Sequence, residues 1–182
     1  MKKAVLIPVT LFALAILASA QMSPQKKPLS PPASAECKFS DGKTIKMDYS
    51  SPRINDPQTH QPRKIFGGLV PYGQIWRTGA NASTTFVTDG NVAVGGTAVP
   101  AGSYTIFTVP NADSWTLVIS KKTGEWGTDY PGEKEDLARV PMAASKTAAT
   151  VDNFAIAFDP SGSKCTLRME WENTRASVDI TK

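Results

Sequence analysis

An arginine and an asparagine stand close together at the end of a glycine-rich, aromatic stretch that covers residues 64–81. Arg77 offers a planar guanidinium that suits a carboxylate, a phosphate or sugar hydroxyls, and Asn81 offers both a donor and an acceptor. Tyr72 and Trp76 add aromatic surface to the same stretch. The combination predicts a binding site for a small polar ligand. The structural alternative is that Arg77 pairs with a buried carboxylate and Asn81 caps a turn.

A second polar stretch near the C-terminus has a similar make-up. It consists of Trp171, Glu172, Asn173, Thr174 and Arg175. Alternation of side chains along a strand turns Trp171 toward the core and Glu172 to the other side, and Asn173-Thr174 predicts a hairpin turn. The stretch forms one polar site with Arg77 only if the two meet in space. Otherwise it is a core tryptophan beside a Glu172–Arg175 surface pair that contributes under about 1 kcal/mol.

A third aromatic group lies in the loop that contains Trp126, Gly127 and Tyr130. Aromatic faces near a loop tip form a stacking platform for sugar rings, because one face of a pyranose is apolar. We therefore include Trp126 among the candidate ligand-binding residues. The alternative is that Trp126 folds back and plugs one end of the fold.

Catalytic chemistry has little support, and we name no catalytic residue. The chain has one histidine, His60, and no Gly-x-Ser-x-Gly turn for a nucleophilic serine. Glu170 and Glu172 are candidates for a carboxylate pair by residue type alone. The acidic residues at 129–136 indicate a solvated turn more than a metal site. We expect no metal and no cofactor, and a carboxylate-dependent hydrolase remains an alternative function.

The first twenty residues have the pattern of a cleaved signal peptide. Lys2 and Lys3 precede an apolar run, and Ala18-Ser19-Ala20 forms a small-x-small cleavage site. Export to the periplasm or the cell exterior follows, with no membrane span in the mature chain. Loss of these two lysines reduces the formal net charge from +4 to +2. This near balance, without a concentrated basic patch, argues against nucleic acid as a partner.

The chain has two cysteines, Cys37 and Cys165, near the two ends of the predicted domain. An even number of cysteines in an oxidising compartment predicts a disulfide. Such a bridge stabilises by roughly 4 kcal/mol on the loop-entropy account. The alternative is a pair of buried free thiols.

Hydrophobic alternation with a period of two runs through most of the chain from Glu36 onward and predicts strands with one buried face. Gly95-Gly96 and other turn signals separate the strands. We predict an all-β fold, an antiparallel β-sandwich or flattened barrel of about eight or nine strands. One or two short helical turns are expected near residues 65–69 and 133–138. The predicted organisation is a signal peptide at 1–20, a tether rich in proline and serine at 21–35, and one domain at 36–182.

Four sequence pieces together resemble the bacterial DUF2911 family of unknown function. They are residues 48–52 with 65–81, residues 92–104, residues 126–140 and residues 171–175. The resemblance implies a shared fold and a place for a site, and it implies no reaction. The loop at residues 54–61, which holds His60, is longer than the usual connection in that family.

These observations favour an exported, non-catalytic module that binds a small polar ligand, a glycan or an envelope protein. A structural or interaction protein without a ligand site is the main alternative. In that case both Arg77 and Arg175 are expected to be buried and paired with carboxylates.

Overall fold

The computed structural model describes residues 29–127 and 129–182, so the predicted signal peptide and most of the predicted tether lie outside the described residues. The strands are β1 (Pro32–Lys38), β2 (Thr44–Ser50), β3 (Thr84–Thr88), β4 (Val92–Val94), β5 (Thr97–Val99), β6 (Gly102–Pro110), β7 (Ser114–Ser120), β8 (Asp136–Ser161) and β9 (Lys164–Thr181). The first strand thus begins within the predicted tether, earlier than the expected start at Glu36.

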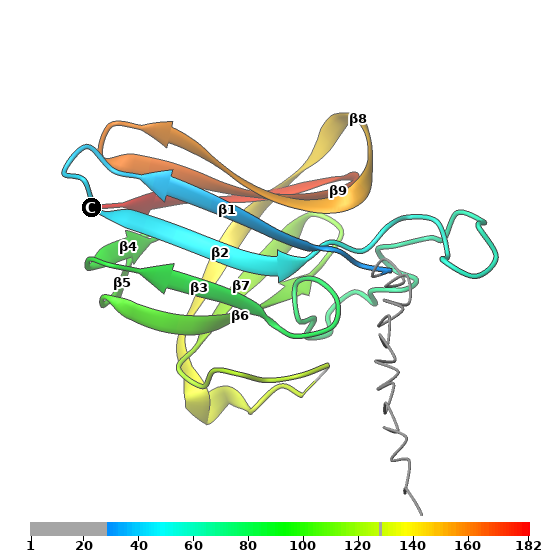
Figure 1. Ribbon diagram of the computed structural model, residues 1–182, viewed down its shortest axis with the longest axis horizontal. Coiled ribbons are helices and arrows are strands. Elements are labelled where there is room, and N and C mark those ends of the chain that lie inside the picture. Colours follow the sequence, from blue (N-terminus) through cyan, green and yellow to red (C-terminus); the bar gives the residue numbers. More distant parts are fainter. Residues whose placement is uncertain (1–28, 128) are drawn as a thin grey trace, which may run out of the picture.

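All nine strands belong to one antiparallel sheet in the order β1-β2-β3-β6-β7-β8-β9-β4-β5 (Figure 1). The predicted all-β antiparallel fold is confirmed, and the sheet is not closed into a barrel. The turn between β4 and β5 is Gly95-Gly96, with φ angles of 53° and 83°. This left-handed geometry at both central residues is the reason that a two-residue hairpin turn favours glycine.

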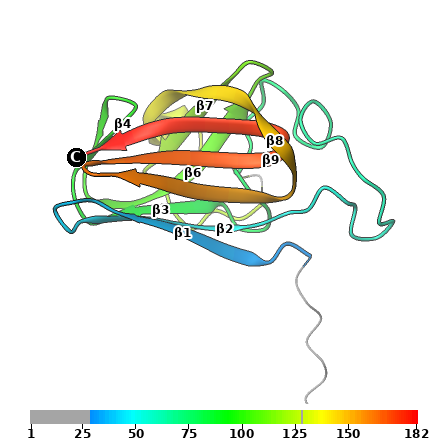
Figure 2. The ribbon, with the colours of Figure 1, turned by 90° about the horizontal axis from the view of Figure 1, so that it is seen from above.

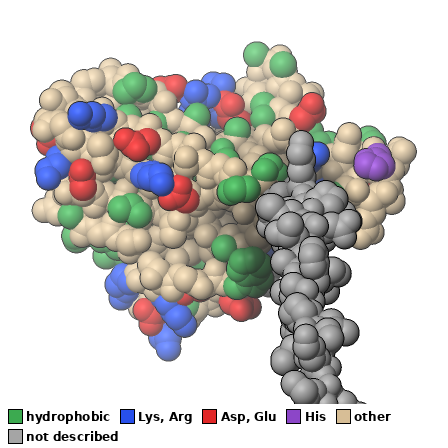
Figure 3. Space-filling model, in the orientation of Figure 1, with side chains coloured by type: hydrophobic (Ala, Val, Ile, Leu, Met, Phe, Trp, Pro, Cys, Tyr) green, Lys and Arg blue, Asp and Glu red, His purple; other side chains and the backbone are tan. Residues whose placement is uncertain are grey.

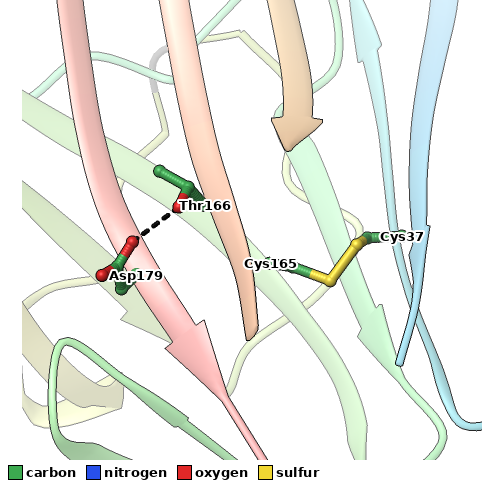
Figure 4. The surroundings of a disulfide bond; sticks show 4 residues. All are labelled: Cys37, Cys165, Thr166 and Asp179. Carbon is green, nitrogen blue, oxygen red and sulfur yellow. Dashed lines mark hydrogen bonds between the residues drawn. A yellow bond between two sulfur atoms is a disulfide. The ribbon is translucent and has the colours of Figure 1, made fainter. Parts of the chain in front are cut away.

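The last two strands are long and bent. Thr166 Oγ1 donates a hydrogen bond of 2.7 Å to Asp179 Oδ1, although the two residues are 13 positions apart in β9 (Figure 4). A straight strand would separate them by about 43 Å, so β9 must reverse its direction. Glu172 has a φ of 54° and lies at this reversal. The turn predicted at Asn173-Thr174 falls in the same place.

Strand β8 follows this reversal around its outside (Figure 2). Its first part pairs with the second part of β9, as Ala143 opposite Ser177 shows, and its last part pairs with the first part of β9, as Phe158 opposite Leu167 shows. Register shifts separate the two paired regions. Each of the two strands thus contributes two segments, and β8 and β9 together form a layer of four strand segments.

The sheet folds over so that β9 and β4 face β2, β3, β6 and β7 across the core. Side chains from both sides meet around one small void. They belong to Met47, Phe86, Val94, Ile106, Leu117, Ile119, Leu167 and Ile180. Each of these side chains is buried. The period-two pattern of the sequence therefore describes the inner face of the folded sheet.

Helical structure in the described residues is limited to the 3₁₀ turn η1 (Glu133–Glu135), in the place predicted at residues 133–138. Residues 65–69 form hydrogen-bonded turns instead of a helix. No helix in the described part of the chain is long and apolar enough to cross a membrane. Basic and acidic side chains are interspersed on the face shown in Figure 3.

The predicted disulfide is present between Cys37 of β1 and Cys165 of β9 (Figure 4). Their Cα atoms are 6.4 Å apart, and both side chains are buried. The bridge fastens the edge strand β1 to the layer formed by β8 and β9.

Reduction of this disulfide is expected to lower the free energy of unfolding by about 4 kcal/mol, because the unfolded chain gains the entropy of a long open loop. Urea unfolding with and without dithiothreitol measures the difference. A Cys37→Ser, Cys165→Ser double variant serves as the control and should not respond to dithiothreitol. Equal unfolding midpoints of the oxidised and reduced wild type would contradict the expectation.

Candidate functional site

The long connection between β2 and β3, residues 51–83, forms no strand of the sheet. Loops of this length without regular structure are uncommon in compact domains and are usually functional or disordered. Hydrogen bonds hold this one at several places, and two of them position the residues of the site. The backbones of Trp76 and Thr108 of β6 exchange two hydrogen bonds of 2.8 and 2.9 Å. Arg53 forms an isolated antiparallel bridge with Asn153 of β8.

An aromatic cluster anchors the middle of this connection to the core. Trp76 stacks on Trp171 of β9 with ring centroids 6.0 Å apart and an interplanar angle of 18°. Trp76 also contacts Phe154 edge-on at 5.0 Å, and Phe66 contacts Trp115 at 4.9 Å. Pairs of this kind contribute about 0.5–1.5 kcal/mol each beyond the buried area. The position of Trp76 is therefore fixed by core packing.

The backbone after Trp76 is strained. Thr78 has a φ of 57° and Asn81 a φ of 59°, in a region that β-branched residues such as threonine avoid. Gly79 lies between them with a φ of 156°, and a Cβ at this position would lie 2.9 Å from the carbonyl oxygen of Ser50. Backbone strain of this kind costs on the order of 1–3 kcal/mol per residue and clusters at functional sites.

Hydrogen bonds of the buried Thr78 hold the strained backbone in place. Its hydroxyl donates to Trp76 O at 3.3 Å and lies 3.1 Å from Thr108 Oγ1, and its carbonyl oxygen accepts from Thr84 Oγ1 at 2.7 Å. Arg77 is thus positioned between a tryptophan packed into the core and a threonine whose hydroxyl and carbonyl groups are hydrogen-bonded.

A cavity of about 450 Å³ lies between this connection and Trp171. Its volume is within the range of small-molecule sites, about 300–1,000 Å³. Its polar lining consists of Ser30, Arg53, Asn55, Arg63, Gln74, Arg77 and Asn81. Among the described residues that line it, none is Asp or Glu. The cavity is therefore rich in positive charge.

The guanidinium of Arg77 is half-buried and has no carboxylate within 4.0 Å in the part of the chain that the structure describes. Its Nε atom is buried without an acceptor among those residues. Burial lowers the pKa of Arg77 because it desolvates the charged form, yet an arginine remains protonated at neutral pH. The alternative in which Arg77 pairs with a buried carboxylate is therefore not what the structure shows.

Three of the predicted site residues meet in this cavity, namely Trp76, Arg77 and Asn81. Asn81 also has a structural role, because its Nδ2 atom donates to Ser30 O and Ser50 Oγ at 3.3 Å. Tyr72 is 45% exposed and does not line the cavity.

The second predicted stretch does not converge with Arg77. Arg175 pairs with Glu170, which Arg168 also contacts, and the expected Glu172–Arg175 pair is not found among the described residues. Asn173 Oδ1 accepts a hydrogen bond of 3.0 Å from Thr150. Of this stretch only Trp171 lines the cavity.

The remaining candidates do not line the cavity either. Trp126 is 67% exposed, so it does not plug an end of the fold. Tyr130 donates to Asp136 at 2.8 Å, and Arg139 pairs with Asp136. The pKa of Tyr130 is raised, mainly by burial.

Glu170, the candidate for an acid–base role, contacts two arginines and does not line the cavity. Within the described residues, no group of three or more His, Cys, Asp or Glu side chains is placed to hold a metal ion.

Sequence reasoning missed Arg53, Arg63 and Gln74, which also line the cavity. Arg53 and Arg63 flank the loop at residues 54–61. One signal was available, because residues 51–83 contain three arginines and a lysine but a single carboxylate, Asp56. A cationic segment in a chain of nearly balanced charge is a feature that core packing does not require.

The fold and this site define an all-β protein with an arginine-lined cavity at the long connection between β2 and β3. The chain belongs to the family described as Protein of unknown function (DUF2911), which matches residues 30–180. The match confirms the family resemblance and includes every residue that forms the cavity except Leu29. No curated protein and no solved structure matches the chain.

Replacement of Trp76 by alanine is expected to lower the free energy of unfolding by about 3–5 kcal/mol, because it removes a large side chain from the aromatic cluster. The matched control is Trp126→Ala, where an exposed side chain is removed and the change should stay within about 0.5 kcal/mol. Urea unfolding followed by circular dichroism compares them. Similar losses for the two tryptophans would show that Trp76 does not anchor the connection.

Proposed function

We propose that this protein is an exported, non-catalytic binding module that holds a small polar ligand in the cavity at Arg77. The buried, unpartnered Nε atom of Arg77 is the observation that carries the proposal. A buried donor without an acceptor costs about 1–3 kcal/mol, and this one belongs to a charged group. Such a feature lowers the stability of the empty protein, and a ligand that supplies the acceptor offsets the cost.

The construction of the cavity supports a ligand-binding role. Trp76 and Trp171 stack in the core beside the cavity, and Thr78 keeps a strained backbone angle next to Arg77. Rigid aromatic walls with a few polar groups are typical of preformed small-molecule sites. The absence of a carboxylate pair from the described lining makes binding a better fit than glycoside hydrolysis.

Export is supported by the disulfide and by the sequence pattern of residues 1–20. The Cys37–Cys165 bridge suits an oxidising compartment. The predicted signal peptide itself lies outside the described residues. Both observations agree with a protein that meets its ligand in the periplasm or outside the cell.

Replacement of Arg77 by methionine is expected to leave the free energy of unfolding within about 0.5 kcal/mol of the wild type or to raise it. The reason is that the substitution removes a desolvated charge that lacks a partner. The matched control is Arg139→Met, which leaves the buried Asp136 carboxylate without its arginine and should cost about 1–3 kcal/mol. A large loss for Arg77→Met would favour the structural alternative, in which Arg77 only builds the fold.

A thermal-shift screen of the chain from Gln21 tests binding directly. The screen covers neutral sugars, amines, carboxylates, phosphates and divalent metals. A ligand at one hundred times its dissociation constant adds about 2.7 kcal/mol of stability, and this gain should disappear in Arg77→Met. The absence of any stabilising compound, or a gain that survives in Arg77→Met, would contradict the proposal.

A further inference from the structure

We infer that the ligand of this cavity is an oxyanion with an apolar body, a carboxylate or a phosphate monoester whose oxygens accept from Arg77. The inference rests on the proposed function and names the chemical class of the ligand. Three properties of the cavity carry it: its charge, its unpartnered donors and its apolar wall.

The charge of the lining is positive. Arg53, Arg63 and Arg77 line the cavity, and no Asp or Glu does so among the described residues. Arg63 already donates from Nη2 to Arg53 O at 2.7 Å and from Nε to Ile54 O at 3.2 Å. For Arg53 and Arg77 no ion pair forms within the described residues. A cleft lined by one sign of charge attracts a ligand of the opposite sign.

The one carboxylate of this segment, Asp56, is used elsewhere. Its Oδ1 atom accepts from the backbone N–H groups of Gln58 and Thr59 at 2.9 Å. These hydrogen bonds lower the pKa of Asp56, so it stays ionised within its own turn. Asp56 lines a neighbouring hollow and is not part of the cavity lining. The guanidinium of Arg77 is therefore not neutralised by this loop.

Two residues of the lining carry a buried donor that lacks an acceptor. These donors are Arg77 Nε and Trp171 Nε1, which have no hydrogen-bond partner among the described residues, and both residues line the same cavity. An ionised carboxylate or phosphate presents acceptors without competing donors. A hydroxyl brings its own donor, and an ammonium group brings only donors. The partly buried guanidinium of Arg77, which lines the cavity, is therefore better matched by an oxyanion than by a sugar or an amine.

Part of the cavity lining is apolar. Leu69, Val70, Pro71 and Ile75 line the cavity together with Trp76, and Leu69 is exposed. A bare inorganic anion would leave this wall in contact with water, whereas an apolar body attached to the anion would cover it. Arginine and aromatic groups placed in this way suit a compound that is anionic at one end only.

The segment that precedes the described residues does not supply the anion. Residues 1–28 contain no Asp and no Glu, and Lys26 and Lys27 near the end of this segment are positively charged. Residues 1–28 therefore offer no side-chain carboxylate to Arg77.

Isothermal titration of the chain from Gln21 with matched probes tests the inference. The probes are benzoate, phenyl phosphate, benzamide and acetate. Benzoate or phenyl phosphate should bind, and comparison of the two distinguishes a carboxylate site from a phosphate site. Benzamide lacks the charge and acetate lacks the apolar body, so each should bind at least about tenfold more weakly than the better anion.

Two variants identify the anchor. Arg77→Lys keeps the positive charge but loses the Nε donor and the planar fork, so it should lose at least about tenfold in affinity for the better anion. Lys146→Gln removes an exposed charge of β8 that does not line the cavity, and it should leave the affinity unchanged. The comparison separates the guanidinium from a general effect of net charge.

The results that overturn the inference differ from those that overturn the proposed function. Equal binding of benzamide and benzoate, no binding of either aromatic anion tighter than about 1 mM, or unchanged affinity in Arg77→Lys would each reject the oxyanion assignment. The proposed function would survive if the thermal-shift screen still gave a neutral or cationic ligand that depends on Arg77. If no compound of any class bound, both would fail.

Discussion

The stacking of Trp76 on Trp171 is the contact on which the rest of the site depends. Trp171 belongs to β9 next to the point where this strand reverses, and Trp76 belongs to a long connection without strands of its own. Their contact holds the connection in a fixed position against the core. Because Trp76 also bonds to the backbone of β6, Arg77 is fixed relative to both layers of the sheet. A connection of this length would otherwise have the conformational freedom of a surface loop.

Two unfavourable features sit side by side at this point. Thr78 holds a left-handed backbone conformation, and Arg77 holds a desolvated guanidinium without a partner. Proteins retain such local costs where function requires a group to be ready for a ligand, and the surrounding core offsets them. The Cys37–Cys165 bridge adds to the stability that offsets these costs, because it restricts the unfolded chain.

Much of the fold could be predicted from the sequence, because period-two alternation reports which face of a strand is buried. The Gly95-Gly96 turn could be predicted because glycine adopts the positive φ angles of a hairpin turn. The disulfide could be predicted from two cysteines in a chain that carries an export signal. The site was harder. Arg175 has Glu170 as its partner only because β9 reverses between them, and alternation along one strand carries no information about such a reversal. The role of Arg53 and Arg63 depends on the path of an irregular loop, which no periodicity describes.

The central claim is that the unpartnered donor of Arg77 receives the ligand. The most direct measurement is the ¹H–¹⁵N spectrum of the arginine Nε–H and tryptophan Nε1–H groups during titration with benzoate or phenyl phosphate. The account predicts saturable shifts of the Arg77 and Trp171 resonances, with little change for the paired Arg139 and Arg168. Shifts confined to the paired arginines, or no shift of the Arg77 resonance, would contradict it.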